Sequence, residues 1–334
     1  MAREETEKLT QILWGVALSR AVCTIGELGI ADQIQTGSPQ CVETLAGITG
    51  AHERSLYRIL RFLASHGIFQ EKDNRQFDHT PLSHCLRSDA EGSFRAATQM
   101  YHRLFPFWDG LHHSALTGEP GFNKIFKQSV FEYGGAHPEF IPTTDAAMTA
   151  IHGHETAAML EAYDFSAVHL LADIGGGNGS LIAAILVRYP KLKGLLFDTG
   201  HVVGRTRKYL ESYCIDDRCS VIDGNFFESV PSGADTYMFR HILHDWADEQ
   251  SVQILSNCRK VIPKNGRLLI IVAVLPPGNG PSLAKDFDMV MLVLPGGIER
   301  TEDEYRFLLE QTDFQLNSIT PTASVISVVE AKPI

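Results

Sequence analysis

The second half of the chain alternates short apolar runs with amphipathic segments, a pattern that predicts strands separated by helices. Apolar runs of strand length occur at 170–174, 194–198, 219–222, 235–239 and 267–275. Helical patterns cover 180–188, 202–213 and 247–261. Such a series folds as a parallel sheet with helices on both faces. The last two strand patterns, at 314–319 and 324–331, leave no room for a helix and predict an antiparallel hairpin at the sheet edge.

The N-terminal part predicts a winged helix. Apolar positions recur at helical spacing over 8–35, helices follow at 42–46 and 53–64, and 68–70 with 76–78 predict a hairpin. Arg54, Arg58 and Arg61 recur on the second helix, as in winged helices that enter a DNA groove. However, leucines occupy much of the surface of the same helix and are expected to pack against other elements. The net charge of the chain is also −11. A dimerisation module is therefore favoured over a DNA-binding regulator.

Between these parts, residues 90–165 show few strand patterns, and 146–160 predicts one helix. We expect a winged-helix dimerisation domain at 1–95, a helical linker or lid at 96–165 and a cofactor-binding catalytic domain at 166–334. The aromatic and thioether side chains of the middle segment suit either interdomain packing or a lid over a flat aromatic substrate. The candidates for substrate contact are Phe105, Trp108, Met148 and, later in the chain, Met291.

A glycine-rich turn follows the first apolar run of the second half, in LLADIGGGNGS at 170–180. Gly175 and Gly177 allow close approach of a ligand or positive φ, and Ser180 is the expected N-cap of the next helix. The spacing differs from the dinucleotide pattern and holds no basic residue for phosphates. Asp173 instead suits a cofactor with a positive centre and an amino group, such as S-adenosylmethionine. Asp198, at the next strand tip, is placed for ribose hydroxyls.

Further candidates follow the later strands. Asn225 is placed to form a hydrogen bond with adenine and Phe226 to stack on its ring, although these residues are equally compatible with an ordinary turn. Tyr133 is a further candidate for cofactor contact. His244 is the expected general base, with His241 as a competitor, because an imidazole suits proton removal near neutral pH. Glu299 lies on a loop before a helix, either as a solvated acid or as the group that orients the imidazole.

Composition and charge limit the classes of partner that we expect for this chain. The chain has 334 residues, 44% of them apolar, which is enough for two domains. It contains no run of eighteen apolar residues and no signal-peptide core, so we expect no membrane partner and a cytoplasmic location. The acidic balance argues against nucleic acid as the main partner. The six cysteines form no C-x-x-C pair, so neither zinc nor a disulfide framework is indicated.

Several motifs together carry a resemblance that runs nearly end to end. They are DIGGGNG, FDTGHVV, DGNFF, RHILHDWADE, GRLLIIVAVLPPG and GGIERTEDEYRFLL. With them the chain resembles the small-molecule O-methyltransferases of the caffeate and acetylserotonin type, including bacterial natural-product members. The resemblance implies a class I Rossmann-like methyltransferase, an intertwined homodimer, an aromatic substrate such as a phenol, phenazine or polyketide, and no metal.

The same resemblance implies site residues. It assigns S-adenosylmethionine to a set of five residues: Gly175, Asp198, Asn225, Phe226 and Arg240. It makes His244 the base for the acceptor hydroxyl, Glu299 its orienting partner and Asp245 a neighbour that tunes it, with S-adenosylhomocysteine as the second product.

Three positions depart from the pattern of that family. Gly200 stands where many relatives have Pro, Asn225 where many have Asp, and Val272 where relatives often carry a Glu that flanks the base. The last change leaves His244 with one carboxylate fewer. It keeps open an alternative function on the same fold and cofactor, namely pericyclic, decarboxylative or hydroxylating chemistry.

Overall fold

A computed structural model describes residues 2–334 and separates them into two compact units. The first unit holds the described residues up to Pro106 together with His137–Gly153. The second holds Phe107–Ala136 and His154–Ile334. Helix α9 (Ile141–Ala162) contributes residues to both units. The segment 96–165, which the sequence sets apart as a linker or lid, is thus shared between the two.

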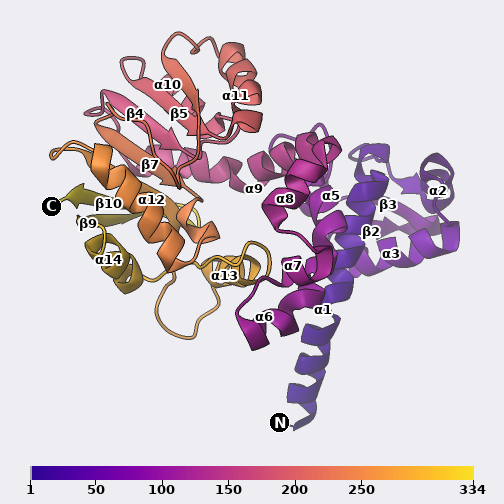
Figure 1. Ribbon diagram of the computed structural model, residues 1–334. Helices are drawn as coiled ribbons and strands as arrows, with labels where there is room; N and C mark the ends of the chain where they lie inside the picture. The colour runs from indigo at the N-terminus through magenta and orange to yellow at the C-terminus, as the bar shows by residue number, and fades with distance from the viewer. Residues whose placement is uncertain (1) are drawn as a thin grey trace. The chain divides into compact units, whose positions relative to one another are not determined.

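The first unit has the winged-helix order that the sequence predicts (Figure 1). Its strands form a three-stranded sheet of order β1-β3-β2, and β2 pairs antiparallel with β3 from Phe69↔His79 to Lys72↔Gln76. Leu56, Leu60 and Leu63 of α3 are buried, as expected for a packing helix. The elements are α1 (Ala2–Leu28), β1 (Gln40–Cys41), α2 (Val42–Thr49), α3 (Glu53–Ser65), β2 (Phe69–Lys72), β3 (Gln76–His79), α4 (Pro81–His84) and α5 (Arg95–Leu104).

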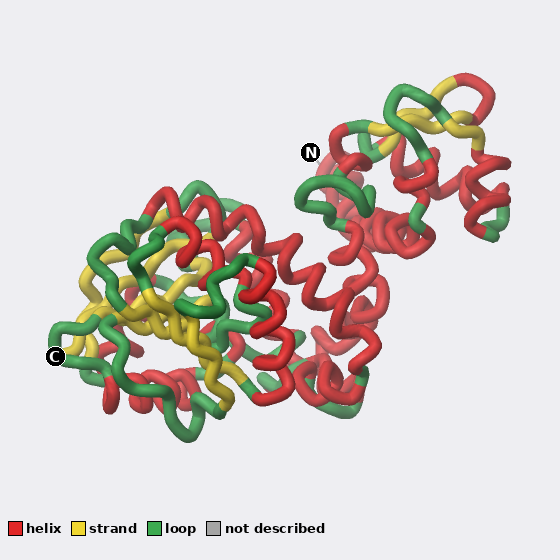
Figure 2. The backbone as a smooth tube through the Cα atoms, turned by 90° about the horizontal axis from the view of Figure 1, so that it is seen from above, coloured by secondary structure: helices red, strands yellow, loops and turns green. Residues whose placement is uncertain are grey.

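The second unit contains the predicted sheet, seen in Figure 2 as a layer of strands between helices. Its order is β6-β5-β4-β7-β8-β10-β9, with β4 to β8 parallel and the β9–β10 hairpin antiparallel at the edge. The strands are β4 (Leu170–Ile174), β5 (Lys193–Asp198), β6 (Cys219–Asp223), β7 (Thr236–Arg240), β8 (Arg267–Ala273), β9 (Phe314–Pro321) and β10 (Ile326–Pro333). All seven strands predicted for this sheet are therefore confirmed.

The helices of the second unit include the three predicted ones and others that the sequence patterns left undefined. They are α6 (Leu111–Thr117), α7 (Gly121–Phe126), α8 (Val130–Ala136), α10 (Ser180–Arg188), α11 (Gly200–Ser212), α12 (Asp248–Val261), α13 (Leu283–Val293) and α14 (Glu302–Glu310). Gly200 is the first residue of α11, a position where a proline is well tolerated.

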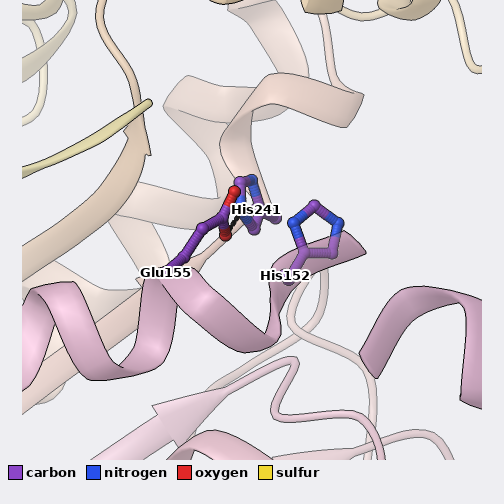
Figure 3. Close-up of side chains that lie close together, drawn as sticks. All are labelled: His152, Glu155 and His241. Carbon is purple, nitrogen blue, oxygen red and sulfur yellow. Dashed lines mark hydrogen bonds and ion pairs between the residues drawn. The ribbon is translucent and has the colours of Figure 1, made fainter. Parts of the chain in front are cut away.

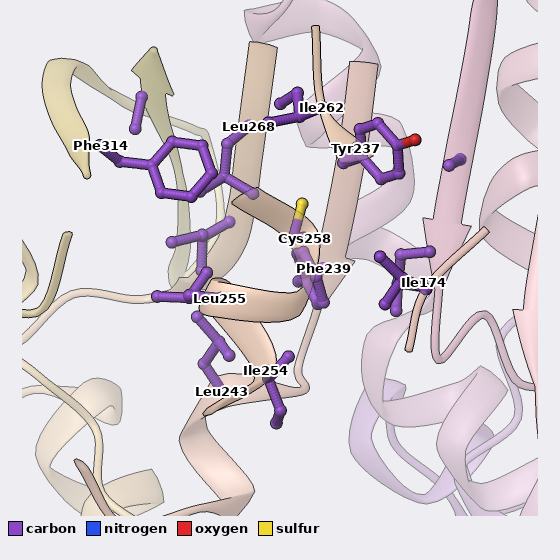
Figure 4. Close-up of a cluster of buried hydrophobic side chains, with 14 of the residues drawn as sticks. Ile174, Tyr237, Phe239, Leu243, Ile254, Leu255, Cys258, Ile262, Leu268 and Phe314 are labelled. Atoms are coloured by element: carbon purple, nitrogen blue, oxygen red, sulfur yellow. The ribbon is translucent and has the colours of Figure 1, made fainter. Parts of the chain in front are cut away.

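Two apolar layers bury the sheet on both faces. One layer packs strand residues such as Phe239 and Leu268 against α12 and α14, and Figure 4 shows part of it. The other packs the opposite face against α10, α11 and the end of α9. Val272 is fully buried in the first layer. Because the strand order reverses between β4 and β7, a ligand is expected at the carboxyl ends of these two strands.

Helix α1 stands out for its exposed apolar side chains. Leu9, Ile12, Leu13 and Val16 recur on one face and are more than half exposed, as is Trp14. The sequence predicts no membrane span, yet by length and composition the segment Arg3–Leu28 could cross a membrane. This is weak support for a span, because a signal sequence near the N-terminus and a core helix of a soluble protein share the same length and composition.

Candidate functional site

The glycine turn at the carboxyl end of β4 is tied to the neighbouring strand. Gly175, Gly177 and Gly179 have φ angles of 73°, 58° and 83°, which favour glycine at each position. Gly175 N donates to Phe197 O at 2.7 Å, and Gly177 N donates to Asp198 Oδ2 at 2.8 Å. The turn therefore presents a fixed backbone at the predicted ligand crevice.

The prediction that Ser180 is the N-cap of the following helix is wrong. Gly179 is the N-cap and Ser180 is the first helical residue, whose N–H donates to Asn178 Oδ1 at 3.0 Å. Gly179, in the left-handed conformation, takes the cap position, so the helix begins one residue earlier than a Ser180 cap would allow, and the Asn178 amide oxygen accepts from a helix-end donor.

Carboxylates gather where β4, β5 and β6 end. Asp198 and Asp223 are register partners, and Asp173 lies so close beneath the turn that a Cβ at Gly176 would be 2.9 Å from its Oδ2. Burial raises the pKa of Asp173 to about 7, while the Arg240 charge opposes this shift. Carboxylates at this edge fit a ligand that has a cationic centre and hydroxyl groups, as S-adenosylmethionine has.

The residues after β6 form a short capped turn with an aromatic surface. Asn225 Oδ1 accepts from Phe227 N at 3.0 Å, and its Nδ2 donates to Glu228 Oε1 at 3.3 Å. The Phe227 ring meets Trp246 edge-on at 4.7 Å, and Phe131 of α8 stacks on Trp246 at 5.2 Å. Aromatic faces thus collect around Phe226, which itself lies 6.2 Å from Trp246.

The end of β7 carries a buried ion-pair cluster. Arg240 Nη2 donates to Glu155 Oε2 at 3.0 Å, and His241 Nε2 lies 2.8 Å from the same oxygen. Figure 3 shows Glu155 on α9 beside His241, with His152 one turn earlier on that helix. His241 has a φ of 52°, an uncommon left-handed conformation for a side chain of this size.

His244 and Glu299 form the most buried acid–base pair of the crevice. His244 lies in the 3-10 turn Leu243–Asp245, directly after β7, and is 6% exposed. Its Nδ1 lies 2.6 Å from Glu299 Oε1, and Glu299 is fully buried. Asp245 Oδ1 is 3.6 Å from the other ring nitrogen, Nε2. Both nitrogens therefore face carboxylates, even though the flanking Glu of relatives is replaced by Val272.

The charges around His244 oppose the effect of burial on its pKa. Burial alone would lower the pKa of His244, but Asp245, the hydrogen bond with Glu299 and the charge of Glu155 together leave it raised above 6.5. Burial has the opposite effect on an acid and raises the pKa of Asp245 to about 6, although the charge of His244 lowers it. An imidazole in this setting holds a proton more strongly than a free histidine does.

The remaining candidates are distributed over both units. In the second unit, Tyr133 packs edge-on against Phe122 and Phe126, and Trp108 packs against Phe107. Also in this unit, Met291 O accepts from the amides of Gly296 and Gly297, just before Glu299. Phe105 and Met148 belong to the first unit, where the Arg20 guanidinium lies over the Phe105 ring at 4.6 Å.

Three residues of the site escape sequence reasoning. Glu155 is a buried acid within a weakly charged helical segment, and that isolation is its only signal. Trp246 lies two residues after His244, inside a motif that carries the resemblance but assigns it no role. Asp288 Oδ1 accepts from Glu299 N at 3.0 Å, a contact between residues eleven positions apart that no local pattern marks.

Family models match both parts of the chain. That of the O-methyltransferase domain matches residues 108–315, and that of the O-methyltransferase dimerisation domain matches residues 10–89. The chain belongs to this O-methyltransferase family. It is an S-adenosylmethionine-dependent methyltransferase of the bacterial natural-product type acting on aromatic substrates. The predicted family, fold and cofactor are thereby confirmed, and methyl transfer is supported over the non-methylating alternative.

Individual relatives cover almost the whole chain. A phenazine O-methyltransferase of Lysobacter antibioticus is 39% identical over 98% of this chain and 96% of its own. A phenazine-1-carboxylate N-methyltransferase of Pseudomonas aeruginosa is 31% identical over 93% and 92%. The O-methyltransferase NcsB1 of neocarzinostatin biosynthesis was crystallised with S-adenosylmethionine and 2-hydroxy-5-methyl naphthoic acid. It matches with a TM-score of 0.85 at 28% identity, over 95% of this chain and 96% of its own.

Proposed function

We propose that this enzyme methylates a hydroxyl group of a small aromatic secondary metabolite, with His244 as the general base. The observation that carries the proposal is the buried His244–Glu299 pair, 2.6 Å apart, directly after the strand that flanks the glycine turn. A buried imidazole with an acid on one nitrogen is the arrangement that presents the other nitrogen as a base.

The residues proposed to hold the cofactor surround the crevice at β4, β5 and β6. Asp198 would accept ribose hydroxyls, Asn225 and Phe226 would contact adenine, and Asp173, Arg240 and the Gly175–Gly177 backbone would hold the charged amino-acid end. Tyr133 is a further proposed contact. When bound, S-adenosylmethionine supplies an electrophilic methyl group on a sulfonium. The protein's own task is then to orient the acceptor, exclude water and remove one proton.

His244 carries out the proton step. Its Nδ1–H donates to Glu299 Oε1, which fixes the tautomer and leaves Nε2 with the lone pair that takes the acceptor proton. Asp245, 3.6 Å from Nε2, stabilises the imidazolium that forms. Proximity supplies on the order of 7–11 kcal/mol of the barrier, and base catalysis contributes about 10²–10⁴-fold.

The base favours oxygen over nitrogen as the methyl acceptor. A neutral phenol becomes a strong nucleophile only when its proton is removed, whereas an aromatic amine attacks through its lone pair without prior deprotonation. His241 is less suited as the base, because the Glu155 oxygen that its Nε2 contacts also accepts a hydrogen bond from Arg240 Nη2, so this carboxylate is shared with a guanidinium. We therefore propose O-methylation, although the family members named above include an N-methyltransferase.

A labelling experiment tests the acceptor class. The enzyme is incubated with methyl-labelled S-adenosylmethionine and matched pairs of hydroxy and amino derivatives of naphthoic acid and phenazine-1-carboxylic acid. Mass spectrometry then locates the label. We expect label on oxygen in the hydroxy compounds, with rates that rise as the His244 base is freed at higher pH. Label confined to nitrogen would overturn the proposal.

We further infer that the enzyme is a cytoplasmic homodimer formed through its dimerisation domain, with Phe105, Trp108, Met148 and Met291 contacting the aromatic acceptor. The stripe of Leu9, Ile12, Leu13 and Val16 on α1 supports the dimer, since an apolar helix face of this kind is typical of a protein interface. The net charge of −11 supports a protein partner over nucleic acid.

A further inference from the structure

Arg300 is the bulkiest fully buried side chain among the described residues, and it directly follows Glu299. Its guanidinium donates most of its hydrogen bonds to backbone carbonyls. Nη1 donates to Leu243 O at 3.0 Å and to Ile298 O at 3.3 Å. Nη2 donates to Trp246 O at 3.0 Å. A charged group 1% exposed is costly to bury, and these bonds satisfy it.

The three carbonyls belong to the two loops that carry the acid–base pair. Leu243 and Trp246 bracket the turn that contains His244, and Ile298 precedes Glu299. A further bond joins the same loops directly, from Ile298 N to His244 O at 2.8 Å. The loops approach so closely that a Cβ at Gly297 would lie 1.8 Å from His244 O. The side chain of Arg300 thus bridges the backbones that set the imidazole–carboxylate distance.

Asp248 fixes the direction of the guanidinium. Its Oδ1 accepts from Arg300 Nε at 3.0 Å and from Nη2 at 2.8 Å, while its side chain remains 62% exposed. Ser251 Oγ, one turn further along α12, lies 3.3 Å from Nη2. A lysine could occupy the same channel, but its single ammonium cannot reproduce a planar fork that reaches both loops and Asp248 together.

We propose that Arg300 is a positioning residue for the methyl transfer, because it holds the His244 turn and the Glu299 loop in the register that sets the Nδ1–Oε1 contact. This inference rests on the proposed role of His244 as the base. It assigns to Arg300 no contact with cofactor or acceptor. Loss of the fork shifts the imidazole relative to the acceptor oxygen, and misplacement by about 1 Å costs on the order of 10²-fold in rate.

The test compares Arg300→Lys with Arg259→Lys in the full-length enzyme. Arg259 is a matched control, since it also donates to main-chain oxygens, Asp313 O at 3.0 Å and Ile334 O at 2.6 Å, but at the far edge of the sheet. Asp248→Ala is the second test variant, in which the exposed acid is removed and the buried guanidinium stays. Thermal unfolding and cofactor affinity are measured first, to establish that each variant is folded.

Two readouts separate positioning from general stability. The first is kcat with the KM for S-adenosylmethionine. The second is the NMR signal of the His244 Nδ1 proton, with the pH titration of the ring. We expect Arg300→Lys to lower kcat about 10- to 100-fold. The KM for S-adenosylmethionine should stay within about threefold of the wild-type value, and the signal of the strongly hydrogen-bonded His244 Nδ1 proton should be lost. Asp248→Ala should give smaller changes in the same direction, and Arg259→Lys none.

A folded Arg300→Lys variant with wild-type kcat and an unchanged His244 signal would overturn the proposal. If that variant does not fold, Asp248→Ala decides, and an unchanged His244 signal there overturns it equally. The NMR readout does not depend on turnover. A finding that His244→Ala retains full activity would therefore refute the base role while the positioning of the ring by Arg300 is still measured.

Discussion

Replacement of Glu299 by glutamine tests the acid–base pair with the smallest change in shape. Full charges 2.6 Å apart attract by about 6 kcal/mol at an effective dielectric constant of 20. Burial of His244 opposes this attraction, but the charges of Asp245, Glu299 and Glu155 and the hydrogen bond with Glu299 together leave its pKa raised above 6.5. Removing the Glu299 charge leaves the burial in place while Asp245 and Glu155 remain, so the pKa of His244 should fall from its raised level.

The glutamine amide also changes which ring nitrogen of His244 carries the proton. Glu299 Oε2 is buried and accepts no hydrogen bond from the residues that the structure describes. If the nitrogen of the new amide takes this place, a buried donor is left unsatisfied, at a cost of about 1–3 kcal/mol. If it faces Nδ1 instead, the ring must carry its proton on Nε2, where it cannot act as a base. We expect kcat to fall about 10²–10⁴-fold, which is roughly 2.7–5.4 kcal/mol in the barrier.

The assay is the pH dependence of kcat/KM for the preferred acceptor. For the wild type, kcat/KM should rise with pH through a pKa above 6.5, because only the neutral imidazole accepts a proton. For Glu299→Gln, the acidic limb should move to lower pH while the plateau drops. Glu302→Gln, which removes an exposed acid three residues away, should leave the profile unchanged. A Glu299→Gln plateau at the wild-type level would refute this account of the pair.

Other predictions follow from single contacts. His244→Ala should lower kcat about 10²–10⁴-fold with cofactor affinity, measured by calorimetry, nearly unchanged; loss of that affinity alone would contradict the assignment. Asp198→Ala should weaken cofactor binding by about tenfold or more in the same assay, since the lost carboxylate would hold the ribose and also accepts from Gly177 N. Gly297→Ala places a Cβ against His244 O and should cost about 1–3 kcal/mol, seen as a lowered Tm. Leu13→Glu should give monomers in sedimentation, whereas the exposed control Leu82→Glu should not.

The sequence predicts the sheet well because its signals are local. The central strands β4, β5, β7 and β8 are short apolar runs, and burial on both faces makes those runs continuous. The sequence predicts the winged helix equally well, since the spacing of Leu56, Leu60 and Leu63 directly indicates the buried face of α3. Ser180 is wrongly predicted as a cap because its residue type fits that role, while Gly179 takes it through backbone conformation.

The site is predicted only where its residues follow strand ends. His244 comes directly after β7 and Asp198 ends β5, so topology alone brings them to one crevice. Glu155 reaches Arg240 and His241 from a helix that lies 85 and 86 residues earlier, a meeting that no periodicity encodes. The contacts of Arg300 with the His244 turn likewise depend on how the two loops pack.

The central claim, that the His244 imidazole removes the acceptor proton, is tested most directly by chemical rescue. His244→Gly should transfer labelled methyl to the preferred hydroxylated acceptor slowly, and added imidazoles should restore the rate in proportion to their basicity. Rescue should be absent in the wild type and weak for imidazoles too bulky for the buried cavity. A His244→Gly enzyme that is as fast as wild type, or one whose rate ignores the basicity of the added imidazole, would contradict the claim.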